Sequence, residues 1–455
     1  MNILFVSNGA LTPVYSNVAK HLQSRGHKIF WIVTERVWLK FLLKDFNKRS
    51  ILHLNKNSID KLHNTPNIKI PLNEIIFIDR EIKTWGSDKY LKYIQNLHHQ
   101  LKNFLISNEI NFAFSENTWA HEIIISMICD VDNEVNCIHL SPHNIRIPDN
   151  KFAFFSDFLL HKPFIHNGPF DEIKESCLKQ NKQIIAQDDV IVSRRKSKIH
   201  WIRKLISFVA RNNYDNDSPT LWGTRRYNSL KRNLSDLLKG FTYKFVNKLD
   251  EAAIAELAKT HELYVYAFHK EPETAINNKG RYNESQATNI INIWRKLPLG
   301  CVLLIKEHRV SIGDRGYFYF QKLLKLGSIK VINESIKSSF VMEKCSVCFT
   351  VSGTMAYEFA INQKPALTFA KVFFNDLKYC SHLSTTELTK GDDMNALIKR
   401  LILGKEGLNN KQYVEQLSSQ CFSGTIDDTN NLPEVMNSSN IALLCSAFER
   451  VVEQS

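Results

Sequence analysis

The chain has 455 residues, of which 44% are hydrophobic and 23% are charged, and its formal net charge is +13. This length exceeds one ordinary hydrophobic core and predicts two domains, and the composition excludes a largely disordered chain. The positive charge favours an anionic partner, such as nucleic acid, acidic lipid head groups or a nucleotide-linked substrate.

The cysteines and the N-terminus indicate a cytoplasmic protein. Nine cysteines follow no disulfide framework, which predicts reduced thiols. Cys345 and Cys348 form one CxxC pair, but no second pair lies at zinc spacing, so we expect a buried strand there and no metal. The N-terminal MNILFVSNGA has no basic region or cleavage site and is expected to be a first strand. No run approaches the roughly 20 apolar residues of a membrane span.

Residues 1–165 are predicted to form a Rossmann-like domain on the acceptor side of the protein. The run NILFVSN, a periodic segment from Val14 to Leu22 and the run KIFWIV predict strand, helix and strand. Further strands are expected at 74–79, 110–116 and 135–141, with a helix over 88–107. Because strands and helices alternate, we expect a parallel, doubly wound sheet.

Residues 166–260 are predicted to be a basic helical connector. Between Arg194 and Lys248 basic residues outnumber acidic ones and strand patterns are missing. Within this stretch, 198–212 places Trp201, Leu205 and Phe208 on one side of a helix with basic residues elsewhere. Such a helix packs on its own protein with a solvated basic face, or lies on an anionic membrane surface.

Residues 261–430 are predicted to form a second Rossmann-like domain, the nucleotide-sugar donor side, followed by a C-terminal helix over 431–455. Strands are expected at 262–269, 301–307, 329–333, 346–353 and 365–370, and helices at 284–297, 317–326, 338–343 and 355–361. The predicted fold class is therefore α/β, with two Rossmann-like doubly wound domains facing a cleft and a helical connector. A cleft between domains is a usual place for a ligand.

Three strand ends of the second domain carry polar side chains: FHKEPE (268–273), IKEHR (305–309) and VSGTMAYE (351–358). Open α/β sheets bind ligands at the carboxyl ends of their strands. Ser352, Gly353 and Thr354 stand between a strand and a helix, where backbone N–H groups and hydroxyls meet the positive end of the helix dipole. That pattern is typical of phosphate binding, and ordinary turn chemistry selects the same residues.

Lys306 and His308 strengthen the phosphate hypothesis. A cation and an imidazole at the neighbouring strand end would neutralise the same phosphate and support its departure as a leaving group. The alternative is a surface salt bridge among Lys306, Glu307 and Arg309, which would contribute little. The chain has no Walker A motif, and no GxGxxG follows its first strand, so nucleotide hydrolysis and dinucleotide redox chemistry are disfavoured.

The first domain carries a polar strand end in FAFSENTWAHE, where Glu116 is a candidate general base or transition-state stabiliser. The alternative is that Ser115 or Asn117 caps the following helix and Glu116 lies in its first turn. The stretch NIRIPDNKFAFFSD adds Arg146 and Asp149 beside a proline, as expected of a substrate loop, while its aromatic residues are expected in the core.

Five segments, YVYAFHKEPET, LPLGCVLLIKEHR, FTVSGTMAYEFAINQKPALTF, FSENTWAHE and RIPDNKFAFF, resemble bacterial capsule and surface polysaccharide biosynthesis proteins related to the Kdo transferases. These are glycosyltransferases of the two-Rossmann (GT-B) type. The resemblance covers most of 110–160 and 262–375, but neither the connector nor the tail. It implies transfer of a sugar, for Kdo-related members a CMP-activated ulosonic acid, to a glycan or lipid-linked glycan acceptor. It also implies no bound metal and no cofactor besides the nucleotide sugar.

The resemblance also implies roles for individual residues. The family shows Lys-Glu-His-Pro or His-Pro at the strand end that contacts the nucleotide phosphate; His308 is kept here, and Arg309 replaces the proline. A sugar carboxylate would pair with Arg146 or Arg309. We therefore predict catalytic roles for Glu116 and His308; nucleotide or phosphate binding by Lys306, Ser352, Gly353, Thr354 and Glu358; and substrate binding by Arg146, His269, Glu271, Glu273 and Arg309.

Other functions stay open at this stage. A glycosyltransferase for UDP-linked sugars would use the same phosphate site, and a nucleotide-sugar epimerase shares the double Rossmann plan but needs no acceptor. A non-catalytic assembly protein could instead dock on the cytoplasmic face of the inner membrane through 194–248. Nucleic-acid binding is disfavoured, because no recognised module or aromatic platform accompanies the charge.

Overall fold

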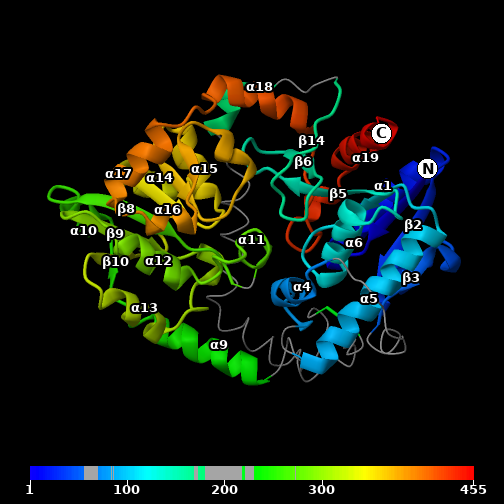
Figure 1. The fold of residues 1–455 in the computed structure, drawn as a ribbon, viewed down its shortest axis with the longest axis horizontal. Coiled ribbons are helices and arrows are strands. Elements are labelled where there is room, and N and C mark those ends of the chain that lie inside the picture. The colour runs from blue at the N-terminus through cyan, green and yellow to red at the C-terminus, as the bar shows by residue number, and fades with distance from the viewer. Residues whose placement is uncertain are drawn as a thin grey trace. The chain divides into compact units, whose positions relative to one another are not determined.

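The computed structural model describes residues 1–55, 70–82, 85, 87–168, 173–179, 218–220, 230–271 and 273–454. These residues form two compact units. The first contains the described residues of 1–173, 204–229 and 416–455, and the second contains those of 174–203 and 230–415. Each unit is built on its own seven-stranded sheet (Figure 1). The prediction of two Rossmann-like α/β units is confirmed.

The first sheet has the order β14-β6-β5-β4-β1-β2-β3. Its parallel strands are β1 (Asn2–Val6), β2 (Lys28–Val33), β3 (Ile51–His53), β4 (Phe112–Phe114) and β5 (Ile138–Asn144). Two strands, β6 (Lys151–Phe155) and β14 (Phe422–Ser423), extend it in antiparallel fashion. The chain proceeds outward in opposite directions from β1 and β4, so the topological switch point lies between these two strands.

Helices cover the first sheet, and its strands are therefore buried on both faces. The helices are α1 (Thr12–Ser24), α2 (Arg36–Leu42), α4 (Leu72–Ile78), α5 (Ser87–Ser107), α6 (Ala120–Val131) and α19 (Ser438–Glu453), with short 3-10 helices at Gly9–Leu11, Lys48–Ser50 and Pro433–Met436. On one face α1 and α19 lie side by side (Figure 1). There Phe448 packs 4.8 Å from the ring centroids of both Phe114 and Phe154.

Of two expectations for this unit, one is wrong and the other is confirmed. The strand expected at 74–79 is wrong, because these residues form α4, which buries Ile75 and Ile78 one turn apart. A short apolar run suits a buried strand and a buried helix equally, so periodicity alone could not separate them. The aromatic residues after Pro148 lie in the core as expected, since Phe152 and Phe154 are fully buried in β6.

The second sheet is parallel throughout and has the order β13-β12-β11-β8-β9-β10-β7. Its strands are β7 (Lys248–Leu249), β8 (Glu262–Ala267), β9 (Cys301–Lys306), β10 (Ile329–Ile332), β11 (Val347–Thr350), β12 (Ala366–Thr368) and β13 (Cys380–His382). The switch point of this sheet lies between β8 and β11. The strands expected over 262–370 are confirmed, because each is a buried, nearly continuous apolar run.

The helices of the second unit are α9 (Leu230–Tyr243), α10 (Glu251–Leu257), α11 (Thr274–Asn277), α12 (Gln286–Trp294), α13 (Tyr317–Leu324), α14 (Ser338–Lys344), α15 (Thr354–Ile361), α16 (Thr385–Thr389) and α17 (Met394–Ile398). Short 3-10 helices lie at Glu175–Lys179, Arg309–Ser311 and Phe373–Asp376, and a π-helical turn at Lys399–Leu403. The chain then forms α18 (Asn410–Gln420) before β14. The four helices expected between 284 and 361 are all present.

The predicted connector, 166–260, is described only in part. The candidate amphipathic helix 198–212 lies outside the described residues. Within the predicted range, β7 pairs with β10 in the second sheet, and α9 and α10 belong to the same unit. Of the helices that the structure describes, none is long and apolar enough to cross a lipid bilayer.

The cysteines are free thiols. Cys348 is buried in β11 and Cys345 is buried just before it, as expected of a strand and its edge. Over the described ranges, no group of three or more His, Cys, Asp or Glu side chains is arranged to hold a metal ion.

Candidate active site

His269 lies at the switch point of the second sheet, two residues beyond β8. Its Nε2 accepts a hydrogen bond from the Ser352 N–H at 3.0 Å and lies 3.0 Å from Thr350 Oγ1. Because a backbone N–H can only donate, Nε2 carries no proton, and the neutral ring holds its proton on Nδ1. Burial, helped by nearby cations, lowers the pKa of His269 to about 3, so the ring is neutral at physiological pH.

The backbone of His269 is held as firmly as its ring. The Gln286 side chain accepts from the His269 N–H at 2.8 Å and donates to the His269 carbonyl at 3.1 Å. Arg315 donates a further bond to the same carbonyl at 2.7 Å. Groups held in one geometry by several supporting bonds are typical of binding and catalytic sites.

The turn after β11 brings backbone amides against His269. A Cβ on Gly353 would lie 2.8 Å from Thr350 Oγ1 and 3.3 Å from His269 Nε2, so only glycine fits. Ser352 uses both of its donors inside the protein, its N–H on His269 and its hydroxyl on the Ala275 carbonyl at 3.1 Å. Phosphate binding by Ser352 itself therefore requires one of these bonds to be exchanged.

The helix α15 begins immediately after this turn, and its N-terminus has no side-chain cap among the described residues. The N-cap residue is Gly353, and Thr354 is the first helical residue. The first N–H groups of a helix have no partner within the helix and attract anions. The backbone at Gly353 and Thr354, with the Thr354 hydroxyl, therefore forms a candidate phosphate site beside His269.

Lys306 is the last residue of β9 and is buried. It pairs in register with Ala267 of β8, which pairs with Thr350 of β11, so these three side chains lie in one row on the same face of the sheet. Its Nζ donates to the Ile336 carbonyl at 2.5 Å. Burial, followed by the charge of Arg309, lowers the pKa of Lys306 to about 8.

His308 is close enough to His269 for its charge to contribute to the lowered pKa of His269. His308 is the N-cap of the 3-10 helix Arg309–Ser311, where its Nδ1 accepts from the Val310 N–H at 3.4 Å. A described hydrogen bond joins the 352–354 turn to His269.

Glu307 does not take part in a surface salt bridge. Its carboxylate is buried and accepts from Arg315 Nη1 at 2.6 Å. Arg315 is itself only 6% exposed, lies 3.1 Å from Glu271 Oε1 and stacks 4.3 Å from the Phe268 ring centroid. Burial alone would lower the pKa of Arg315, but Glu307 and Glu271 together raise it, so the guanidinium stays charged.

Sequence reasoning missed Arg315 and Gln286. The only local signal for Arg315 is its position in the glycine-containing loop IGDRG, and Gln286 appears as an ordinary residue at the start of a helix. Neither pattern shows that both side chains return to the backbone of His269. We call the assembly of His269, Gln286, Lys306, Glu307, His308, Arg309, Arg315 and the 352–354 turn the His269 cluster.

The remaining predicted residues of the second unit differ in whether they interact with this cluster. Glu271 joins it through Arg315 and through a hydrogen bond from Gln286. Glu358 lies one turn beyond Thr354 on α15, and its charge acts on Lys306. Glu273 is the N-cap of α11, where its backbone carbonyl accepts from two N–H groups of that helix. No described contact brings the Glu273 carboxylate to the His269 cluster.

Glu116 lies at the switch point of the first sheet. The side-chain amide of Asn8, which follows β1, donates to Glu116 at 2.8 Å and to Glu122 at 3.3 Å. Burial, followed by the charges of Asp427 and Asp428, raises the pKa of Glu116 to about 7. A carboxyl group that titrates near neutral pH suits general acid–base catalysis.

The helix α6 is capped without Glu116. Glu122 accepts from the N–H groups of Thr118 and Trp119 at 2.8 and 3.0 Å, and Asp79 accepts from the Ala120 N–H at 2.9 Å. Ser115, one of the expected capping residues, instead lies 2.8 Å from His139 Nε2. Glu116 precedes the first turn of α6, so the helix dipole does not account for its position.

The acidic neighbours of Glu116 come from a distant part of the chain. The segment 424–432 is held by a pair of hydrogen bonds between Asn144 and Ile426, at 2.6 and 3.0 Å, and by Thr429 on the Ala10 carbonyl. Asp427 also feels the positive charge of Arg146, which has a φ of +72° between β5 and β6. We call Asn8, Arg80, Glu116, Glu122, Arg146, Asp427 and Asp428 the Glu116 cluster.

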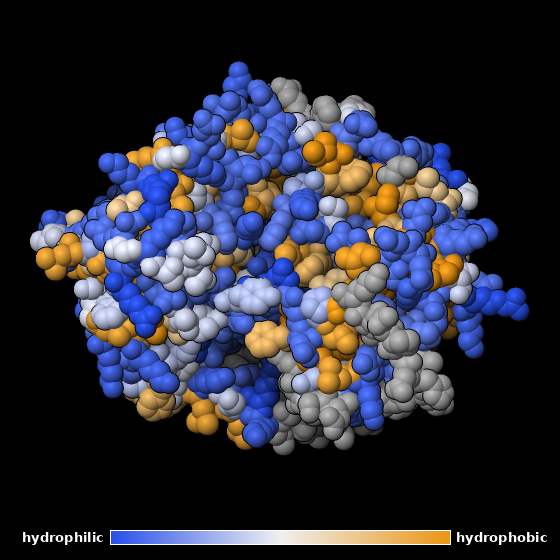
Figure 2. Space-filling model, in the orientation of Figure 1, coloured by the Kyte–Doolittle hydropathy of each residue, from blue (hydrophilic) through white to orange (hydrophobic). Residues whose placement is uncertain are grey.

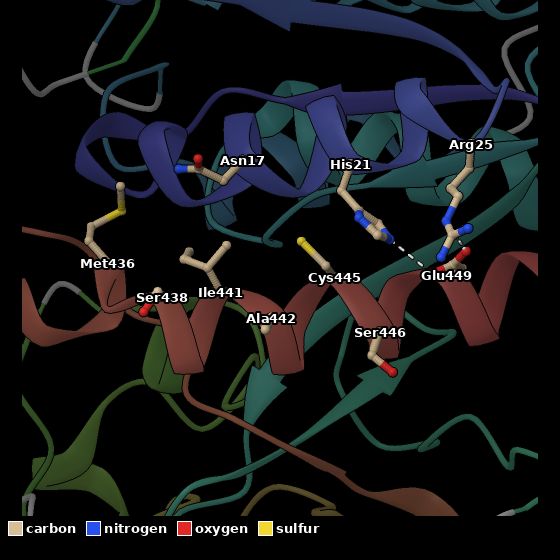
Figure 3. Close-up of a pocket in the computed structure, with 10 residues that line it drawn as sticks. All are labelled: Asn17, His21, Arg25, Met436, Ser438, Ile441, Ala442, Cys445, Ser446 and Glu449. Carbon is tan, nitrogen blue, oxygen red and sulfur yellow. Dashed lines mark hydrogen bonds and ion pairs between the residues drawn. The ribbon is translucent and has the colours of Figure 1, made fainter.

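A separate open cavity of about 680 Å³ lies between α1 and α19 (Figure 3). In it His21 and Arg25 of α1 pair with Glu449 of α19 at 2.9 and 2.8 Å. The other lining residues are Asn17, Met436, Ser438, Ile441, Ala442, Cys445 and Ser446. None of the lining residues belongs to the His269 or Glu116 cluster.

No protein-family model matches the chain, and no curated protein matches it. Among solved structures it is similar to KpsC, the beta Kdo 2,7 transferase of Thermosulfurimonas dismutans, with 9% identity over 100% of both chains and a TM-score of 0.37. It is also similar to UDP-GlcNAc 2-epimerase from Methanocaldococcus jannaschii, with 11% identity over 91% of this chain and 98% of that one and a TM-score of 0.24. A third is CalG4, the calicheamicin glycosyltransferase, with 9% identity, 100% and 98% coverage and a TM-score of 0.26. The matching structures include two KpsC Kdo transferases.

The buried ion pair between Arg315 and Glu307 can be tested by a double-mutant cycle. Arg315→Met leaves a buried carboxylate unpaired and is expected to lower the free energy of unfolding by about 3–5 kcal/mol, measured by chemical denaturation. The double variant Arg315→Met/Glu307→Met should recover most of this loss. Arg400→Met, which removes an exposed guanidinium paired with Glu387 and Asp392, is the control and should have little effect. Equal losses in the single and double variants would contradict the pairing.

Proposed function

We propose that the protein is a glycosyltransferase of surface polysaccharide biosynthesis, such as capsule or O-antigen assembly, that binds the phosphate of a nucleotide sugar at the His269 cluster. One observation carries the proposal: a neutral, rigidly held His269 abuts the uncapped N-terminus of α15 at the switch point of a parallel sheet, beside Lys306. Ligands of open α/β sheets bind at this position.

The charges of the His269 cluster suit a phosphate leaving group. When the bond between the anomeric carbon and the phosphate oxygen breaks, negative charge grows on the phosphate. Lys306, Arg309 and the first N–H groups of α15 would stabilise that charge, and Nδ1–H of His269 or the ring of His308 would add a donor. Because side chains supply this neutralisation, we propose a reaction that uses no metal ion and no cofactor besides the donor.

Glu116 is the proposed general base. Its pKa of about 7 allows it to accept the proton of the acceptor hydroxyl while the hydroxyl oxygen attacks the anomeric carbon. The amide of Asn8 holds one carboxylate oxygen of Glu116 and leaves the second for the acceptor.

We further propose that the donor is a CMP-activated ulosonic acid, such as Kdo or a nonulosonic acid. Such a sugar carries a carboxylate on its anomeric carbon, which needs a cationic partner. Arg146 and Arg309 are suitable, because a guanidinium binds a carboxylate through two hydrogen bonds. We propose a glycan or lipid-linked glycan as the acceptor. We also propose that the protein is cytoplasmic, with peripheral contact to the inner membrane.

The donor class can be tested with purified protein and two nucleotide sugars, CMP-Kdo and UDP-GlcNAc. We expect release of CMP from CMP-Kdo that depends on added glycan acceptor. Release of UDP with acceptor would replace the CMP donor by a UDP-linked one. Conversion of UDP-GlcNAc without acceptor would show a nucleotide-sugar epimerase and overturn the transferase.

Lys306 predicts a specific pH dependence of nucleotide affinity. Lys306→Met should weaken CMP binding, measured by calorimetry at pH 7, by about 10- to 100-fold, because a charged hydrogen bond to phosphate is lost. Lys330→Met on the neighbouring strand β10, where the side chain is exposed, is the matched control. Since Lys306 is protonated below a pKa of about 8, wild-type affinity should fall as the pH rises from 7 to 9. The same fall in Lys306→Met would contradict this assignment.

The pKa of Glu116 predicts how kcat depends on pH. If it is the base, kcat of the wild type should rise with pH through about 7, as the carboxyl loses its proton. Glu116→Gln should lower kcat about 100-fold or more and remove this rise. Glu415→Gln on the exposed side of α18 is the control. Retention of the rise in Glu116→Gln would assign it to another group.

A further inference from the structure

The helix α9 turns an apolar face away from the protein. Leu234, Leu237, Leu238 and Phe241 follow the spacing of one helix face, and all four are exposed. Leu238 is 65% and Phe241 is 59% exposed, which is unusual for side chains of this size. Phe245, just beyond the helix, continues the face, with its ring centroid 5.5 Å from that of Phe241.

The outward orientation of this face follows from contacts on other sides of α9. A Cβ on Gly313 would lie 2.8 Å from the Cα of Gly240, so the helix and the 309–316 loop are in close contact. Tyr243 is buried, and its hydroxyl donates to Glu334 at 3.3 Å. At 100° per residue, Tyr243 projects to the side opposite Leu234 and Phe241, and Gly240 lies about 100–120° around the helix from them. These contacts of α9 therefore lie on other sides of the helix than its exposed apolar face.

The charges around the apolar face are positive. Lys231 and Lys244 are exposed, and on the helical projection they border the apolar face on its two sides. Lys239 is also exposed, and the single acidic residue between 230 and 245, Asp236, projects to the same side as Tyr243. Hydrophobic side chains gather at the lower edge of the surface view, where Figure 1 places α9 (Figure 2).

We propose that α9 is an interfacial helix that docks the protein on an anionic lipid membrane. Leu234, Leu238 and Phe241 would enter the boundary between head groups and acyl chains, and Lys231 and Lys244 would contact lipid phosphates. A helix with a wide apolar face bordered by lysines has the pattern of such helices. A second copy of the chain fits less well, because a two-fold contact through this face would bring like-charged lysines together.

This inference deepens the peripheral membrane contact of the proposed function by assigning it to one helix, and it needs neither the donor nor the acceptor to be correct. The helix α9 lies within 194–248, the range considered above for membrane docking, but it is separate from the candidate helix 198–212. A membrane-bound α9 would hold the second unit at the surface where lipid-linked molecules are found.

Vesicle flotation of the full chain tests the docking. Wild-type protein should float with vesicles of equal parts phosphatidylcholine and phosphatidylglycerol, less with phosphatidylcholine alone, and less again as salt is added. Leu238→Gln/Phe241→Gln should lower the partition coefficient about tenfold or more. Leu299→Gln/Leu403→Gln, which changes two other exposed apolar residues of the same unit, is the control and should bind as the wild type does.

The lysines are tested separately. Lys231→Glu/Lys244→Glu should abolish the preference for anionic vesicles, whereas Lys399→Glu/Lys411→Glu, with the same change in net charge at other exposed positions, should keep most of it. Thermal unfolding of each variant shows whether it is folded. The proposal is overturned if the wild type does not float, if Leu238→Gln/Phe241→Gln floats normally, or if that variant instead dissociates a wild-type dimer that binds no vesicles.

Discussion

The contact on which the candidate site depends is the buried ion pair between Arg315 and Glu307. A guanidinium taken out of water is stable only if its hydrogen bonds are replaced, and here two carboxylates and the His269 carbonyl replace them. One side chain therefore joins the ends of β8 and β9. Because Lys306 and His308 flank Glu307 along the chain, the same pair also helps to position these two residues.

The two sheets carry clusters of opposite character at equivalent places. Each cluster lies where the order of the strands reverses, since the helices on either side of that point diverge and leave room at the sheet edge. Around His269, burial and the charge of Arg309 lower the pKa of Lys306. Around Glu116 the neighbouring charges are mostly carboxylates, and the pKa of Glu116 is raised instead. A site for an anionic leaving group and a site for a proton acceptor need these two environments.

Local sequence patterns predicted the strands of the second sheet well. They predicted the elements of the first unit less well. Strands such as β9 and β11 are continuous apolar runs bounded by turns, and this pattern needs no knowledge of the rest of the chain. The run at 74–79 shows the limit, because α5 and α6 stabilise it as a helix through side chains that lie far away in the sequence. The alternative of a surface salt bridge among Lys306, Glu307 and Arg309 is wrong for Glu307, because its partner is the buried Arg315 of the following loop.

The sequence by itself determined the two α/β sheets and the polar residues at the carboxyl ends of their parallel strands, among them Glu116, His269, Lys306 and the 352–354 turn. These follow from strand periodicity and from the order of residues along the chain, which are local properties. Only the tertiary structure decided which partners these groups meet: Gln286 and Arg315 at His269, Asp427 and Asp428 at Glu116. It also decided that the apolar side of α9 faces outward, because the close contact of Gly240 with Gly313 sets the rotation of that helix. Such contacts join residues that are distant in the chain, and no local pattern specifies them.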